Sequence, residues 1–128
     1  MPIELKDQES LALNLEGQEI EVYFRSPNAP EMVRYLASTL SGSGPEAMEQ
    51  MLSAGISLAQ SCLLGIKEGD IVIVDQGRAR GLVTDPARPG YDHNWKQLLK
   101  EKIPGLLLML ANRLVKNAAS ELEVREKN

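Results

Sequence analysis

The stretch Glu9-Ser10-Leu11-Ala12-Leu13-Asn14-Leu15-Glu16-Gly17-Gln18-Glu19-Ile20-Glu21-Val22-Tyr23-Phe24-Arg25 decides the fold of this chain. Apolar side chains alternate with polar or small ones on both sides of Glu16-Gly17, which is the pattern of two strands with one buried face. If Glu16-Gly17 is a two-residue turn, Leu13 faces Ile20 and Leu11 faces Val22, so both apolar rows share a face. We therefore predict a β-hairpin over residues 9–25. Because a lone hairpin is marginal in water, it must lie on a helix, join a third strand or pair with another chain.

Two helices are predicted over residues 29–64, with a Ser-Gly linker at residues 41–44 between them. Asn28 and Glu31 have the spacing of a capping box, so the first helix should begin near Ala29. The second helix should end near Leu64, with Gly65 as its C-cap. Helical spacing gives the first of these helices one apolar stripe, made of Val33, Leu36, Ala37 and Leu40.

The second half of the chain begins with two short strands predicted within residues 70–84, joined at Gln76-Gly77. Helices follow over residues 95–119, interrupted at Pro104, which cannot continue a helix from the preceding turn. The charged tail, residues 120–128, is expected to fray. The prediction is a helix-dominated α+β fold: a single domain over residues 1–128 with an N-terminal hairpin and a second short hairpin.

Composition excludes several classes of function. The formal net charge is -4, which argues against nucleic acid as the main partner because phosphate neutralisation needs clustered Lys and Arg. Cys62 is the only cysteine, so no internal disulfide can form. The first seven residues carry acids and no apolar run, unlike a secretory signal, and the apolar run from Leu106 to Ala111 is too short for a membrane span. We expect a cytoplasmic protein that does not enter a membrane.

Few residues suggest catalysis. His93 is the only histidine, and a metal site built on it would need carboxylates or Cys62; the surrounding loop more simply ends in an N-cap from Asp92 or Asn94. Cys62 lies on an apolar helical stripe, as a buried small hydrophobe would. The segment 75–81 holds two glycines and two arginines without a phosphate-loop pattern, so we interpret it as a turn. No catalytic residue, cofactor or metal site is predicted.

Two features point to a protein partner instead. The first hairpin needs a cover, and the last helix is richer in leucine than one buried face requires. Methionines add adaptable apolar surface. The residues we predict at such a protein interface are Val22, Phe24, Met32, Leu106, Met109 and Leu110.

Three segments resemble the small tail assembly chaperones of long-tailed bacteriophages and prophages. They are a strand that runs through Tyr23-Phe24-Arg25 into a Pro-led helix within residues 19–31, the helical segment ending at residues 61–66, and residues 95–99 leading through Ile103-Pro104 into an apolar helix. The resemblance covers about two thirds of the chain, and the family has no sharp motif from which a functional residue could be transferred.

The resemblance implies a non-enzymatic chaperone in the cytoplasm of a bacterial host. Such a protein would coat the long helical tape-measure protein during tail assembly, would leave before the virion matures, and would self-associate as a homo-oligomer. Two alternatives stay open. The chain could be a stable structural subunit of a phage tail or connector, or a small enzyme or sensor that uses Cys62 or His93.

Overall fold

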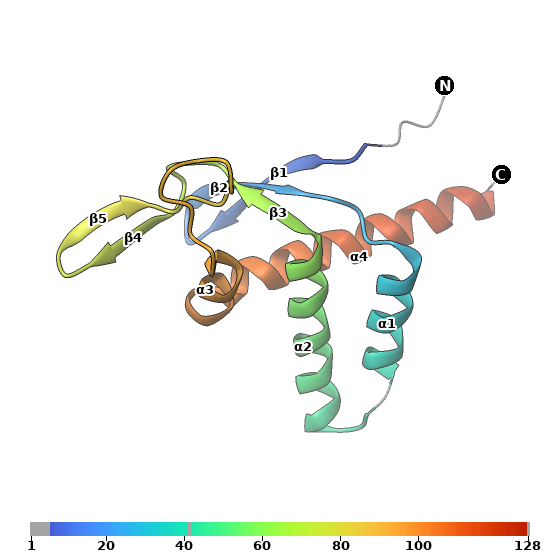
Figure 1. Cartoon of the computed structure of the whole chain (residues 1–128). Helices are drawn as coiled ribbons and strands as arrows, with labels where there is room; N and C mark the ends of the chain where they lie inside the picture. Colours follow the sequence, from blue (N-terminus) through green and yellow to red (C-terminus); the bar gives the residue numbers. More distant parts are fainter. Residues whose placement is uncertain (1–5, 41, 128) are drawn as a thin grey trace.

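The computed structural model describes residues 6–40 and 42–127, which form an α+β fold with four helices and two small antiparallel sheets (Figure 1). One sheet has the order β1-β2-β3, and the other is the pair β4-β5. In chain order the elements are β1 (Glu9–Leu15), β2 (Gln18–Phe24), α1 (Ala29–Leu40), α2 (Pro45–Cys62), β3 (Leu63–Ile66), β4 (Val72–Asp75), β5 (Arg78–Gly81), α3 (Trp95–Lys102) and α4 (Pro104–Lys127).

The N-terminal hairpin has the predicted register. Leu13 lies opposite Ile20 and Leu11 opposite Val22. Glu16 and Gly17 both have positive φ angles, 52° and 81°, as the primed turns of tight hairpins require. The side-chain oxygen of Asn14 accepts a hydrogen bond from the Gly17 N–H at 3.0 Å, which closes the turn.

A third strand, β3, covers the free edge of this hairpin. It pairs antiparallel with β2 and follows α2 directly, since Leu63 is already extended. The predicted helix end near Leu64 with a Gly65 cap is therefore wrong: α2 ends at Cys62, and Gly65 lies in β3 opposite Tyr23. A Cβ atom on Gly65 would lie 3.1 Å from the Thr84 hydroxyl oxygen, so glycine gives this strand room against the segment that follows β5.

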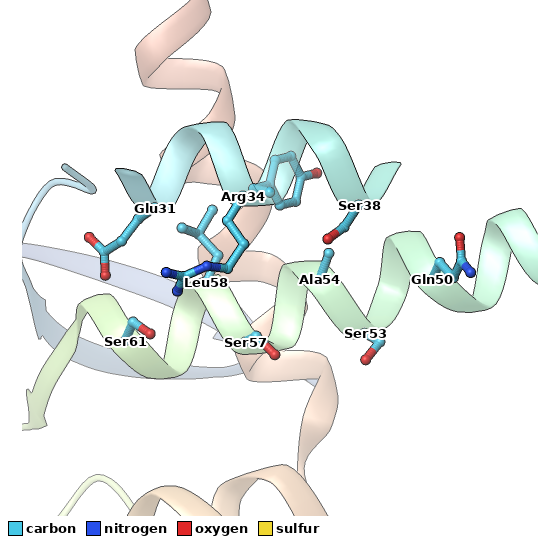
Figure 2. Close-up of a pocket in the computed structure, with 10 residues that line it drawn as sticks. Glu31, Arg34, Ser38, Gln50, Ser53, Ala54, Ser57, Leu58 and Ser61 are labelled. Atoms are coloured by element: carbon cyan, nitrogen blue, oxygen red, sulfur yellow. The ribbon is translucent and has the colours of Figure 1, made fainter. Parts of the chain in front are cut away.

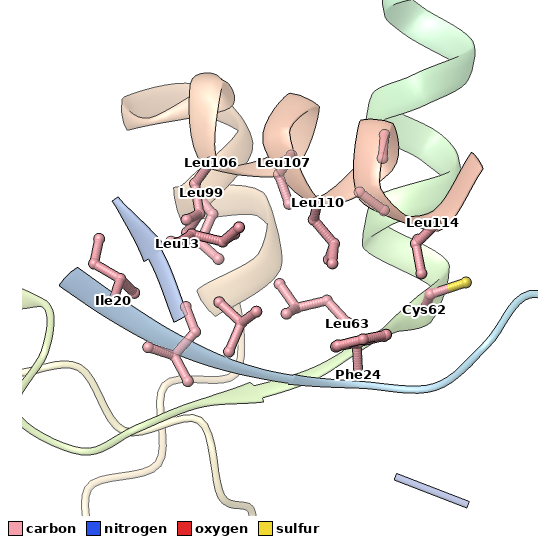
Figure 3. Close-up of a cluster of buried hydrophobic side chains, with 14 of the residues drawn as sticks. Leu13, Ile20, Phe24, Cys62, Leu63, Leu99, Leu106, Leu107, Leu110 and Leu114 are labelled. Atoms are coloured by element: carbon pink, nitrogen blue, oxygen red, sulfur yellow. The ribbon is translucent and has the colours of Figure 1, made fainter. Parts of the chain in front are cut away.

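The core lies between the three-stranded sheet and helices α2, α3 and α4 (Figure 3). The sheet contributes Leu13, Ile20 and Phe24, and the junction of α2 with β3 contributes Cys62 and Leu63. The apolar start of α4 is buried in the core of the monomer. This burial accounts for the many leucines of the helix, which are more than one buried face would require. Its buried residues are Leu106, Leu107, Leu110, Ala111 and Leu114.

The start of α1 carries the predicted capping box. The Glu31 N–H donates to the Asn28 side-chain oxygen at 2.9 Å, and the Asn28 N–H donates back to the Glu31 carboxylate at 3.0 Å. The helix spans Ala29–Leu40 as predicted. None of its residues is buried, so its apolar stripe is not part of the core.

The remaining elements differ from prediction mainly at their ends. The second hairpin exists and turns at Gln76-Gly77, both with positive φ, but β5 ends at Gly81 and does not reach Thr84. Helix α3 stops before Pro104, which begins α4. Helix α4 continues through Lys127, past the end predicted near residue 119. Residue 41 of the linker and residue 128 of the tail lie outside the described residues.

Candidate protein-binding surface

Helices α1 and α2 form a pair that extends away from the sheet, past α4 (Figure 1). One face of α2 packs on α4: Ala59 and Cys62 are fully buried, and a Cβ atom on Gly55 would lie 3.5 Å from the Ala111 Cβ. Toward the start of α2 the same helical face continues as Met48, Met51 and Leu52, which are exposed. The face of α2 that packs on α4 is thus exposed to solvent near the start of the helix.

Helix α1 adds a second exposed apolar stripe. Val33, Leu36 and Leu40 follow each other at helical spacing, and all three are exposed. With the exposed start of α2 this gives six exposed large apolar side chains on two adjacent helices, which we call the distal apolar surface: Val33, Leu36, Leu40, Met48, Met51 and Leu52, whose exposed fractions run from 43% to 83%.

A polar groove of about 360 Å³ lies between the two helices (Figure 2). Arg34 and Ser38 reach into it from α1, and Ser53, Ser57 and Ser61 line it from α2 at intervals of four residues. The two faces of α2 therefore differ in character. The groove side carries serines beside Ala54 and Leu58, whereas the side that packs on α4 carries apolar and small residues.

An ion pair fixes the base of the helical pair. Arg25, at the end of β2, contacts both oxygens of the Glu31 carboxylate, at 2.7 and 2.8 Å, and donates to the Ser61 carbonyl at 3.0 Å. The pKa of Glu31 is lowered from 4.5 to about 2, chiefly by the Arg25 hydrogen bonds and also by the Asn28 N–H, against the opposing effect of burial. These contacts tie α1, α2 and the sheet together at one point.

The six residues predicted at an interface are placed differently. Val22, Phe24, Leu106 and Leu110 are buried in the core. Met32 and Met109 are half-buried and pack against that core. The distal apolar surface, in contrast, is exposed, as are Leu64, Val72 and Val74 elsewhere in the fold. The sequence contains its signal, the apolar stripe on α1 and the methionines of α2, but not the fact that α4 covers only one end of α2.

Cys62 is enclosed by the core. Burial raises the pKa of its thiol to about 11, so the group is protonated at neutral pH. Its polar neighbour is Arg25, whose guanidinium lies 3.9 Å from the sulfur. The nearby Lys96 ammonium donates to the Gln60 carbonyl, and burial lowers the pKa of Lys96. A protonated, enclosed thiol is a poor nucleophile.

His93 is exposed, and its ring packs in a T-shaped arrangement with that of Tyr91, with centroids 4.9 Å apart. Neither Asp92 nor Asn94 caps α3 through its side chain. Instead the Asp92 carboxylate accepts hydrogen bonds from the Val83 N–H and from Arg80, which lowers the pKa of Asp92. One of the two arginines in the 75–81 turn thus holds the loop before α3. Within residues 6–40 and 42–127, no three metal-binding side chains gather as a site.

None of the helices in the described part of the chain has the length and apolar character that crossing a bilayer requires. Comparisons with protein-family models, with curated proteins and with solved structures gave no match to this chain.

Proposed function

We propose that this chain is a non-enzymatic, protein-binding assembly factor that holds its partner on the distal apolar surface. The observation that carries the proposal is the exposure of six large apolar side chains on two adjacent helices. A row of exposed large apolar side chains along a helix is a common mark of a binding site, because leaving it in water has a cost that a partner removes.

The face of α2 suggests the shape of the partner. Where that face is covered within the chain, a helix, α4, covers it. A second apolar helix lying on Met48, Met51 and Leu52 would extend the same kind of packing toward the tip. Methionine suits such a role because its flexible side chain adapts to different partners.

The charges around Met48 suggest which residues border the apolar stripe of the partner. Residues 35–66 contain no Lys or Arg, while Glu46 and Glu49 are exposed beside Met48. A partner helix whose apolar stripe is bordered by Lys or Arg would complement this rim, and its association should be faster at low salt. The resemblance to tail assembly chaperones gives one concrete candidate, a long, helical tape-measure protein.

The experiment is a tagged pull-down after co-expression with the genes that flank this one, with retained proteins identified by mass spectrometry. The test variant is Leu36→Gln combined with Met51→Gln, since both residues are exposed and glutamine favours helix. The matched control is Ser53→Gln, which places the same side chain on the groove side of α2. We expect the double variant to lose the partner and the control to keep it.

The identity of the captured protein decides between the two assembly roles. One very long, helix-rich protein that carries several copies of this chain supports the chaperone role. Recovery of the chain alone, as a closed oligomer, favours a stable structural subunit and rejects the chaperone role. Loss of the partner with Ser53→Gln but not with the double variant would move the site into the groove.

A further inference from the structure

The β4–β5 hairpin stands away from the core sheet, on the opposite side of the molecule from the C-terminal end of α4 (Figure 1). Its first strand comes from the run Asp70-Ile71-Val72-Ile73-Val74-Asp75, in which every residue between the two acids is apolar. Such runs are typical of strands buried on both faces. Here Ile71 and Ile73 pack against the core, but Val72 and Val74 are 52% and 70% exposed.

The backbone of β4 has a free edge at the same two residues. The Leu82 N–H donates to the Ile71 carbonyl, and Asp75 pairs with Arg78 across the two-residue turn. Since hydrogen-bonded positions alternate along an antiparallel pair, Ile71, Ile73 and Asp75 bond inward to β5. The N–H and C=O groups of Val72 and Val74 therefore point outward. Within the described residues, no backbone hydrogen bond from outside the ladder reaches either valine.

Although β4 is short, this edge lacks three other common protections against pairing. Natural edge strands often carry lysine, proline or a bulge that discourages another strand. The four residues from Ile71 to Val74 contain none of these. The other edge of the hairpin, along β5, carries arginines at positions 78 and 80, and Arg80 is held by Asp92.

We propose that β4 pairs antiparallel with β4 of a second copy of this chain, about a two-fold axis at Ile73. In this register Val72 of each copy lies opposite Val74 of the other. The four outward groups of each strand then meet the four of its partner, in two reciprocal hydrogen-bonded pairs. The two hairpins become one four-stranded sheet, in which four valines form a shared apolar patch.

The charges at the strand ends fit the same register. Asp75 lies opposite Ile71 of the second copy, and Asp70 lies opposite Gln76, so no acid faces an acid. Within its own hairpin Asp75 lies opposite Arg78 in the ladder. A shift of two residues would instead place Val74 opposite Asp70 or Val72 opposite Gln76. The contact is small, so the dimer forms in a concentration-dependent manner.

The test is sedimentation velocity over a range of protein concentrations. Val74→Pro removes one outward N–H without touching a bond to β5, a position at which edge strands tolerate proline. Ala79→Pro makes the matched change on the outer edge of β5, because Val74 and Ala79 are opposite each other in the ladder. We expect Val74→Pro to weaken dimerisation at least tenfold and Ala79→Pro to leave it unchanged.

Several results would overturn the proposal. They are a wild-type chain that stays monomeric up to its solubility limit, an oligomer that Val74→Pro does not weaken, and an oligomer that Ala79→Pro weakens equally. If Val74→Pro fails to fold by circular dichroism, Val74→Lys replaces it with the same expectation. The register is tested by Ile73→Cys in a Cys62→Ala background. Opposed residues at a non-hydrogen-bonded position are close enough for a disulfide, so a covalent dimer should form on oxidation, and its absence contradicts the register.

Discussion

Arg25 and Glu31 join the end of β2 to the first turn of α1 through two hydrogen bonds, at 2.7 and 2.8 Å. The same guanidinium reaches the Ser61 carbonyl near the end of α2. The same carboxylate completes the capping box with Asn28. One ion pair thus joins β2, α1 and α2 at the base of the helical pair, in addition to the packing of α2 on α4.

Replacing Glu31 with glutamine is expected to lower the free energy of unfolding by about 2 kcal/mol, because charge-assisted hydrogen bonds to Arg25 are lost. Glu46→Gln makes the same change at an exposed glutamate in the first turn of α2, and it should cost less than about 0.5 kcal/mol. Urea denaturation at pH 7 measures both. Equal effects of the two variants would mean that the Arg25–Glu31 pair contributes nothing specific.

The Arg25–Glu31 ion pair should also make the stability of the fold depend on pH. The pKa of Glu31 is lowered from 4.5 to about 2 in the folded chain, so its contribution is complete above about pH 4.5 and is lost as the pH falls toward 2. The difference in unfolding free energy between wild type and Glu31→Gln should therefore shrink over that interval. Denaturation curves at several pH values between 2 and 6 test this. A difference that stays constant would contradict the lowered pKa.

The thiol of Cys62 should react slowly in the native protein. Its pKa of about 11, against an ordinary 9.0, reduces the thiolate fraction at neutral pH on the order of 100-fold, and burial adds a steric barrier. Alkylation at pH 7 should be slower than that of a free thiol by at least this factor, and it should become normal in denaturant. Native labelling as fast as that of a free thiol would revive a catalytic or sensing role for Cys62.

Two leucines that both lie on apolar stripes should respond differently to truncation. Leu110→Ala removes a side chain from the core and should cost about 2 to 5 kcal/mol. Leu40→Ala changes an exposed side chain and should alter stability by less than about 0.5 kcal/mol. Thermal and urea denaturation measure both. A large loss with Leu40→Ala would show that the end of α1 is packed, and that the distal apolar surface is not exposed.

Local signals in the sequence predicted the elements well, whereas packing between distant elements could not be predicted. Alternation around Glu16-Gly17 predicted the hairpin register, and the Asn28–Glu31 spacing predicted the start of α1. The end of α2 was predicted from Gly65 as a local cap. The structure ends the helix at Cys62 because β2 offers an edge on which residues 63–66 pair, and that edge is about 40 residues away in sequence.

The same distinction explains the site. Phe24 and Leu110 are large apolar residues of the kind found at interfaces, but both lie in the core. Val33 and Leu36 have the spacing of a core-facing stripe, yet they are exposed, and α1 instead packs Met32 and Tyr35 against the core. Periodicity shows that a face is apolar, but only the three-dimensional arrangement shows what covers that face.

The central claim is that the distal apolar surface binds a protein partner. Hydrogen–deuterium exchange of the chain alone and in the captured complex tests it most directly, because the measurement locates the contact without a mutation. The expected result is added protection of amides within residues 33–40 and 48–52 in the complex, with little change across β1 and β2. Unchanged exchange in both helical segments, with new protection elsewhere, would contradict the claim.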